Sequence, residues 1–199
     1  MKAPGDAART SVSAAVDLYW IPLGAGAGGV VVRWSGRTFE ALSAAIARRP
    51  RCRLYHSALE VHIDDRTTTI EMAPVWTKSG DRGVVNEGAV GARLLGKSRL
   101  FRYEIRCWGG GSIPDAAEAV GGPVRVSTDP DAARRVIDLV AECPTPTWGR
   151  DELATGEMWN SNSVTSWLLA RSGLATTGIG PPPGGRAPGW NAGLVAPAG

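Results

Sequence analysis

A serine at the start of a predicted helix is the side chain of this sequence best placed to do chemistry. Asn160 is a good helix N-cap because its side chain can accept a hydrogen bond from a free backbone amide. Apolar residues at helical spacing follow it, and Gly173 stands where a helix ends, which predicts a helix over 160–173. Ser161 precedes the apolar Val164 by three residues, so we expect its hydroxyl on the buried side, at the positive end of the helix dipole. A hydroxyl in that place is a candidate nucleophile once a base lies beside it.

The only two histidines, His56 and His62, are the candidate bases and lie in one predicted strand over 53–63. Both occupy even positions and so face the same side, but six residues of strand span roughly 20 Å, too far for one small site. By the same rise Cys52 lies roughly 13 Å from His56, which argues against a Cys/His metal cluster. We expect neither a metal nor a cofactor.

Two segments resemble the circularly permuted papain-like proteins, namely Leu54-Tyr-His-Ser-Ala-Leu-Glu-Val61 and Trp159-Asn-Ser-Asn-Ser-Val-Thr-Ser-Trp-Leu-Leu169. These proteins include the PPPDE peptidases and the lecithin:retinol acyltransferase family, which are relatives of the NlpC-type amidases. In them a strand histidine comes first, and the nucleophilic cysteine follows in an Asn-Cys-Asn-like motif at a helix N-terminus. The resemblance covers about half the chain and implies that His56 is the base and Ser161 the nucleophile.

The resemblance also implies a third, orienting group on the strand after the histidine. Glu71 fits best, since a carboxylate bonded to one imidazole nitrogen fixes the tautomer and raises the basicity of the other. The alternative is that Glu71 is a solvent-facing strand residue and His56 an ordinary sheet histidine.

Three neighbours of Ser161 are expected to shape its pocket. Asn160 and Asn162 would cap the helix or line the pocket, where backbone amides could form an oxyanion hole. Trp159 would form a wall of an apolar cleft, although most of the eight tryptophans should lie in the core.

Because Ser161 stands where the related families have a cysteine, the sequence supports two hypotheses of function. A cysteine beside a histidine can exist as a thiolate, whereas a serine must lose its proton to His56 during attack. The first hypothesis is a hydrolase or acyltransferase-like protein that acts on an amide or ester through Ser161, His56 and Glu71. The second is a catalytically inactive papain-like module that binds a peptide, an acyl chain or a protein partner, with Ser161 only helping to cap its helix.

The remaining elements predict an α+β fold, with a small antiparallel sheet packed against helices. Strands are expected over 53–63, 67–72 and 99–108, with a turn at Asp64-Asp65. Asp129-Pro130 is a typical helix start. Other expected elements are a helix over 37–49, a flexible hairpin at the glycine run 24–29 leading into a strand over 30–34, a short helical piece over 115–120, and a long loop over 75–97.

Composition bounds the domain and its partners. The 199 residues, 43% hydrophobic and 21% charged, suit one soluble domain over 15–180, with a disordered N-terminus over 1–14 and a Gly/Pro-rich tail over 181–199. Net charge is +3 without a basic block, so we expect no nucleic-acid partner. No run approaches the roughly 18 apolar residues of a membrane span. We expect a cytoplasmic protein that binds a small molecule, lipid or peptide.

Overall fold

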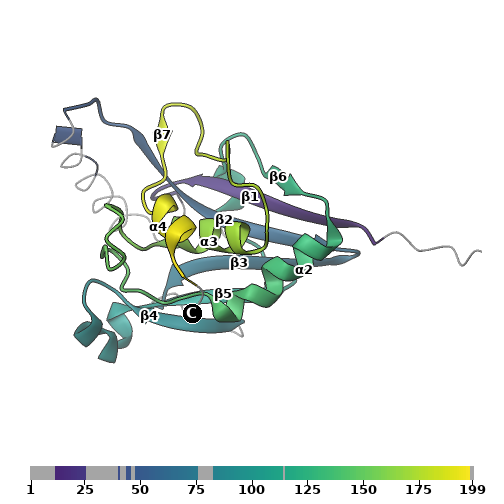
Figure 1. The fold of residues 1–199 in the computed structure, drawn as a ribbon, viewed down its shortest axis with the longest axis horizontal. Coiled ribbons are helices and arrows are strands. Elements are labelled where there is room, and N and C mark those ends of the chain that lie inside the picture. The colour runs from purple at the N-terminus through teal and green to yellow at the C-terminus, as the bar shows by residue number, and fades with distance from the viewer. Residues whose placement is uncertain are drawn as a thin grey trace, which may run out of the picture.

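The strands form one mostly antiparallel sheet in the order β4-β5-β3-β2-β1-β6, and β7 pairs in parallel with the start of β2 (Figure 1). The structure is a computed structural model that describes residues 12–25, 40, 44–45, 48–75, 83–113 and 115–197. The strands are β1 (Ala14–Pro22), β2 (Arg53–Ile63), β3 (Arg66–Pro74), β4 (Val84–Ala89), β5 (Arg102–Gly109), β6 (Val124–Ser127) and β7 (Gly185–Arg186).

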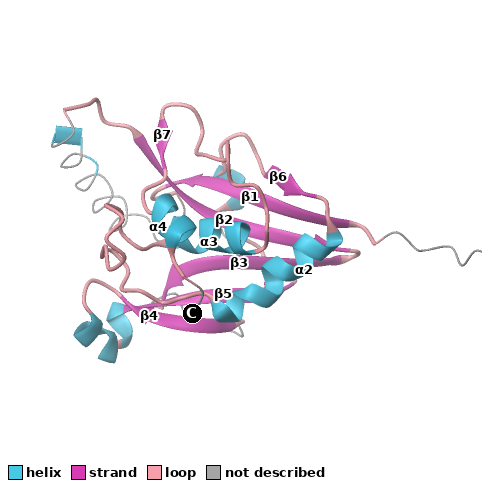
Figure 2. Cartoon of the chain, viewed as in Figure 1, coloured by secondary structure: helices cyan, strands magenta, loops and turns pink. Residues whose placement is uncertain are grey.

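Three α-helices are described, and they lie on the same side of the sheet (Figure 2). They are α2 (Pro130–Asp138), α3 (Ser161–Arg171) and α4 (Trp190–Val195). Short 3-10 turns complete the described elements: η1 (Arg93–Lys97), η2 (Arg99–Phe101), η3 (Ala116–Glu118) and η4 (Leu139–Glu142). The predicted α+β class, with an antiparallel sheet packed against helices, is confirmed.

The local signals at both predicted helix starts are confirmed. The Asp129 side chain accepts from the backbone amides of Asp131 and Ala132, and proline opens α2. Asn160 caps α3 with its side chain in a capping box. Gly173 follows α3 with a φ of 80°, the left-handed conformation that glycine adopts without a steric penalty.

Side-chain alternation gives the sheet two different faces. The helix-facing side carries the main core, in which Trp20, Leu59 and Ile105 pack with Trp167 and Leu168 of α3. The opposite face carries a smaller apolar cluster of Ile21, Ala58 and Ile113, together with most of the charged strand residues. The direction of a strand side chain therefore decides which environment it meets.

Two segments expected to be irregular contain regular structure. The predicted loop over 75–97 contains β4, which pairs antiparallel with β5 because the edge of β5 offers free backbone groups. The predicted tail over 181–199 contains β7 and α4, and it is part of the fold because Ala192 and Ala196 lie buried in the main core.

Other boundaries moved or lie outside the described residues. β1 begins at Ala14, within the segment expected to be disordered, whereas residues 1–11 are not described. The expected hairpin at 24–29, the strand over 30–34 and most of the expected helix over 37–49 also fall largely outside the described residues. The hairpin of β2 and β3, the turn at Asp64-Asp65 and the short helical piece at η3 are confirmed.

Candidate functional site

The N-terminus of α3 is a buried polar junction built around Asn162. This side chain is 2% exposed, and its oxygen accepts a 2.9 Å hydrogen bond from the Ser57 hydroxyl of β2. Its amide nitrogen donates to the backbone oxygens of Tyr55, at 3.0 Å, and Pro188, at 2.9 Å. The side-chain amide of Asn162 thus has three hydrogen-bond partners, two from β2 and one from the segment before α4. A buried polar group needs such partners. Asn162 therefore ties α3 to β2 and to the segment before α4.

The same junction joins α3 to α4 through small and polar residues. Asn160 donates from its amide to the Pro188 carbonyl at 2.8 Å, and the Ser163 hydroxyl donates to the Gly189 carbonyl at 2.7 Å. The Ser166 hydroxyl donates to the Trp190 carbonyl at 2.7 Å. Serine and asparagine side chains thus bind the backbone at the start of α4, where Gly189 provides no side-chain cap.

Ser161 is the first residue of α3 and is 7% exposed, as its predicted position on the buried side requires. Its hydroxyl makes no hydrogen bond to any other residue that the structure describes. Trp159, just before the helix, is 1% exposed and belongs to the main core. It is a core side chain, as most tryptophans here were expected to be, and not the wall of an open cleft.

His56 lies on the other face of the sheet from Ser161. The β1–β2 register pairs His56 with Ile21 and Ser57 with Trp20. Because paired residues share a face and neighbours alternate, Ser57 points toward α3 with Trp20, whereas His56 points with Ile21 into the smaller cluster. The structure does not bring the predicted base to the predicted nucleophile.

Burial alone explains the electrostatics of His56. Desolvation lowers the pKa of its imidazole from 6.5 to about 4, because the charged ring loses water without gaining a partner. No hydrogen bond joins the ring to another described residue. At neutral pH the histidine is therefore an uncharged side chain packed against the sheet.

Glu71 shares the face of His56 but binds a different residue. Its carboxylate accepts a 2.9 Å bond from the Arg106 guanidinium, which also donates at 2.9 Å to Glu104. Burial raises the pKa of Glu71, and Arg106 opposes that shift. Glu71 is therefore part of a cross-strand ion network, and its described partner is an arginine instead of the predicted histidine.

The second histidine has the ordered partners that the first lacks. His62 Nδ1 lies 2.9 Å from the Thr67 hydroxyl, and Nε2 lies 3.3 Å from a carboxylate oxygen of Asp17. Arg125 also binds that carboxylate, and so ties β6 to β1. The β2–β3 register pairs His62 with Thr67, and the β1–β2 register pairs it with Ala15, two residues before Asp17 on the same face of β1. These contacts join four strands, β1, β2, β3 and β6, and Glu60 lies 4.0 Å from the same imidazole nitrogen. The network is therefore a clamp across the sheet.

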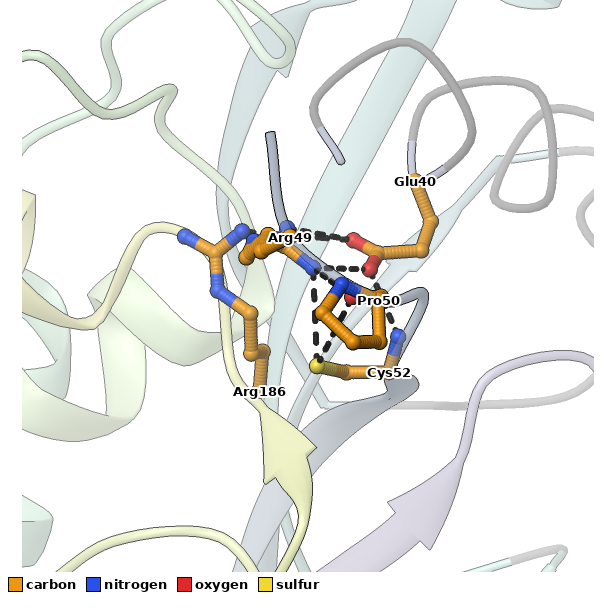
Figure 3. Close-up of polar contacts among 5 residues, drawn as sticks. All are labelled: Glu40, Arg49, Pro50, Cys52 and Arg186. Atoms are coloured by element: carbon orange, nitrogen blue, oxygen red, sulfur yellow. Dashed lines mark hydrogen bonds and ion pairs between the residues drawn. The ribbon is translucent and has the colours of Figure 1, made fainter. Parts of the chain in front are cut away.

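A second clamp secures the start of β2 (Figure 3). Glu40 is buried, and its carboxylate binds the Arg49 guanidinium at 2.5 and 3.0 Å and the Cys52 backbone amide at 2.7 Å. Arg186 of β7 lies 3.9 Å from the same carboxylate. The two hydrogen bonds from Arg49 Nη1 and Nη2 lower the pKa of Glu40, so the clamp is ionic at neutral pH.

The rest of the described part of the chain contains neither a metal site nor an activated thiol. No group of three or more acidic, histidine or cysteine side chains there could hold a metal ion. No described helix is long and apolar enough to cross a membrane. Cys143 is buried, which raises the pKa of its thiol, and burial also raises the pKa of Cys107. Neither thiol is activated as a nucleophile.

Comparisons with known proteins do not assign this chain to a family. No family model, no curated protein and no solved structure matches the chain.

Proposed function

We propose that this protein is a binding domain of permuted papain-like type in which Ser161 performs no catalysis. The separation of Ser161 and His56 onto opposite faces of the sheet carries the proposal. A serine needs a base within about 3 Å of its hydroxyl to become a nucleophile. His56 could face α3 only if β2 slipped by one residue in the sheet. That slip would turn Tyr55, Leu59 and Val61 out of the main core, which costs too much free energy.

The papain-like architecture is the second part of the proposal. A strand histidine followed by a hairpin, and later a helix that starts in Asn-Ser-Asn and packs on the sheet, supports it. In this chain the motif serves packing, because Asn160, Asn162 and Ser163 use their side chains to hold β2 and the segment over 188–190.

An exposed apolar surface supports the binding role. Large apolar side chains stand in solvent on β4 and on the two turns that follow it, with exposed fractions between 38% and 79%. They are Val84, Val85, Leu94, Leu95, Leu100 and Phe101. Several large apolar side chains exposed within one stretch of the chain, as over 84–101, support an interaction site, whereas single exposed ones are ordinary.

Alkylation of a Ser161→Cys variant tests whether the site is inert. The three native cysteines are first replaced by serine, and iodoacetamide labelling of the introduced thiol is followed against pH with and without His56→Ala. We expect the two labelling profiles to coincide, because the imidazole lies behind the sheet. A thiol that reacts in mildly acidic solution and loses that reactivity with His56→Ala would overturn the proposal.

A fluorophosphonate probe gives an independent check on the unmodified chain. We expect no labelling of Ser161, since its hydroxyl has no base to accept its proton. Labelling that disappears in both Ser161→Ala and His56→Ala would restore the hydrolase hypothesis.

A further inference from the structure

The two turns between β4 and β5 carry an unusual combination of side chains. Leu94 is 79% exposed and Leu100 is 67% exposed, the highest fractions among the large apolar residues that the structure describes. Leu95 and Phe101 beside them are 43% and 41% exposed. We call the segment Arg93–Phe101 the η1–η2 projection. Figure 1 shows it in teal beyond the end of β4, at the outer edge of the sheet.

Backbone and ionic contacts hold the projection in place. The Gly91 amide donates to the Trp148 carbonyl at 2.9 Å, and the Arg150 guanidinium donates to the Gly91 carbonyl at 2.6 Å. Arg93 binds Glu152 through two nitrogens, at 3.1 and 3.0 Å. The apolar side chains are therefore presented by a fixed scaffold, so binding does not have to order the loop first.

All charged side chains of the projection are positive. Four basic residues and no acidic residue occur between Glu87 and Glu104. Two of the four, Arg93 and Arg102, are paired with Glu152 and Glu87. The other two, Lys97 and Arg99, are exposed and form no ion pair within the described part of the chain.

This combination fits an anionic lipid surface better than a protein groove. Leucine and phenylalanine side chains can enter the boundary between headgroups and acyl chains, while lysine and arginine beside them remain at the level of the phosphates. Each basic residue near an anionic leaflet contributes about 1 kcal/mol of attraction. A protein interface of ordinary size instead takes about 20–30 residues from each partner, whereas the projection consists of two short turns joined by Ser98.

We infer that the η1–η2 projection docks the protein peripherally onto membranes rich in anionic phospholipids. Leu94 and Leu100 insert, and Lys97 and Arg99 bind the headgroup phosphates. Membrane docking rests on the binding role proposed above and names its partner. It uses residues on η1 and η2, which are not part of the polar junction around Asn162.

Vesicle flotation with the full chain tests the docking. Vesicles of phosphatidylcholine alone are compared with vesicles that also contain phosphatidylglycerol, at low and high salt. We expect binding only to the anionic vesicles, with weaker binding at high salt because the screening length shortens. Lys97→Gln/Arg99→Gln should lower the partition constant about 25-fold, about fivefold for each charge. Leu94→Ser/Leu100→Ser should lower it at least as much, because two apolar side chains no longer insert.

Two matched variants act as controls. Val195→Ser removes an apolar side chain that is 61% exposed on α4, and Arg134→Gln removes a half-exposed cation on α2. Both should bind vesicles like the unmodified chain.

Three results would overturn the inference. They are absence of binding to anionic vesicles by the folded chain, equal binding to neutral vesicles, and binding unchanged in Leu94→Ser/Leu100→Ser. Self-association in solution that this double variant abolishes, without vesicle binding, would assign the projection to a second copy of the chain. The alkylation of Ser161→Cys reports separately on the inert site, so either proposal can fail alone.

Discussion

The Ser57 hydroxyl and the Asn162 side-chain oxygen lie 2.9 Å apart, although 105 positions separate the two residues in sequence. His56, the immediate neighbour of Ser57, has its side chain on the opposite face of the sheet. The strand residue that meets α3 is therefore the serine, and the motif that resembles a catalytic site performs a packing role here.

Asn162→Ala should destabilise the fold strongly. It leaves the Ser57 hydroxyl and two backbone carbonyls buried without their partner, and each such loss costs roughly 1–3 kcal/mol. We expect a loss of about 3 kcal/mol in the free energy of unfolding, measured by urea denaturation. Ser161→Ala, one residue earlier, is the matched control and should change it by less than about 0.5 kcal/mol. Equal effects of the two substitutions would contradict this assignment.

Gly193→Ala should disrupt the contact between α3 and α4. An added Cβ would lie 2.0 Å from the Ser163 carbonyl oxygen and 2.1 Å from the Ser166 hydroxyl, both held by the helix. Because backbone must move, we expect a loss of roughly 1–3 kcal/mol in the free energy of unfolding. At Gly180 an added Cβ meets nothing within 4 Å, so Gly180→Ala should leave the unfolding midpoint unchanged or raise it slightly. A Gly193→Ala chain as stable as Gly180→Ala would show that α4 does not pack as described.

Acid should weaken the fold through His56. The pKa of His56 is about 4 in the folded chain, whereas the ordinary value, expected in the unfolded chain, is 6.5. Between these two pH values the unfolded chain therefore binds a proton that the folded chain does not. Stability is therefore retained above about pH 6.5 and falls as the pH decreases toward about 4. The loss amounts to about 3 kcal/mol, since each pKa unit corresponds to roughly 1.4 kcal/mol. Urea denaturation at several pH values, compared with His56→Gln, isolates this part of the slope. A slope that persists unchanged in the variant would refute the assignment to His56.

Arg106→Met should leave two carboxylates in a buried site without their shared cation. Breaking a buried ion network by removing one partner costs about 3–5 kcal/mol at neutral pH. In the variant, the Arg106 guanidinium no longer opposes the effect of burial, so the pKa of Glu71 rises further above its ordinary value. The folded state then binds more protons than the unfolded chain, and stability should increase as the pH falls. Thermal unfolding at neutral and mildly acidic pH measures this dependence. Adding Glu71→Gln to Arg106→Met should recover part of the loss, and no recovery would argue against a shared network.

Local signals predicted the elements that local interactions stabilise. The β2–β3 hairpin follows from alternation, and α2 and α3 follow from the caps at Asp129 and Asn160. β4 carried no such signal, because a register shift between Val84 and Asn86 breaks the alternation of this edge strand. α4 follows Gly189, which offers no side-chain cap, and the carbonyl groups of Gly189 and Trp190 accept hydrogen bonds from α3 side chains.

The candidate site could be predicted only in part, because it too depends on contacts between distant segments of the chain. Alternation shows that His56 and Ser57 point in opposite directions, but it does not tell which of them faces the helix. The choice depends on the neighbours of each residue in the folded chain. Ser57 lies beside Trp20 and binds Asn162, whereas His56 lies beside Ile21. Sequence thus located Ser161 at a buried helix start, whereas pairing it with His56 required tertiary information.

The bonds from α3 to the segment over 188–190 also bear on how this protein is made. The ribosome makes β1 to β3 first, whereas the backbone partners of Asn160, Ser163 and Ser166 are made after α3 itself. Until those carbonyls are made, the Asn160, Ser163 and Ser166 side chains lack their bonds to the segment over 188–190, and Trp167 lacks its bond to the Pro197 carbonyl. β1 to β6 are therefore made before these partners, and the core around α3 is completed only after the segment over 188–197 has been made.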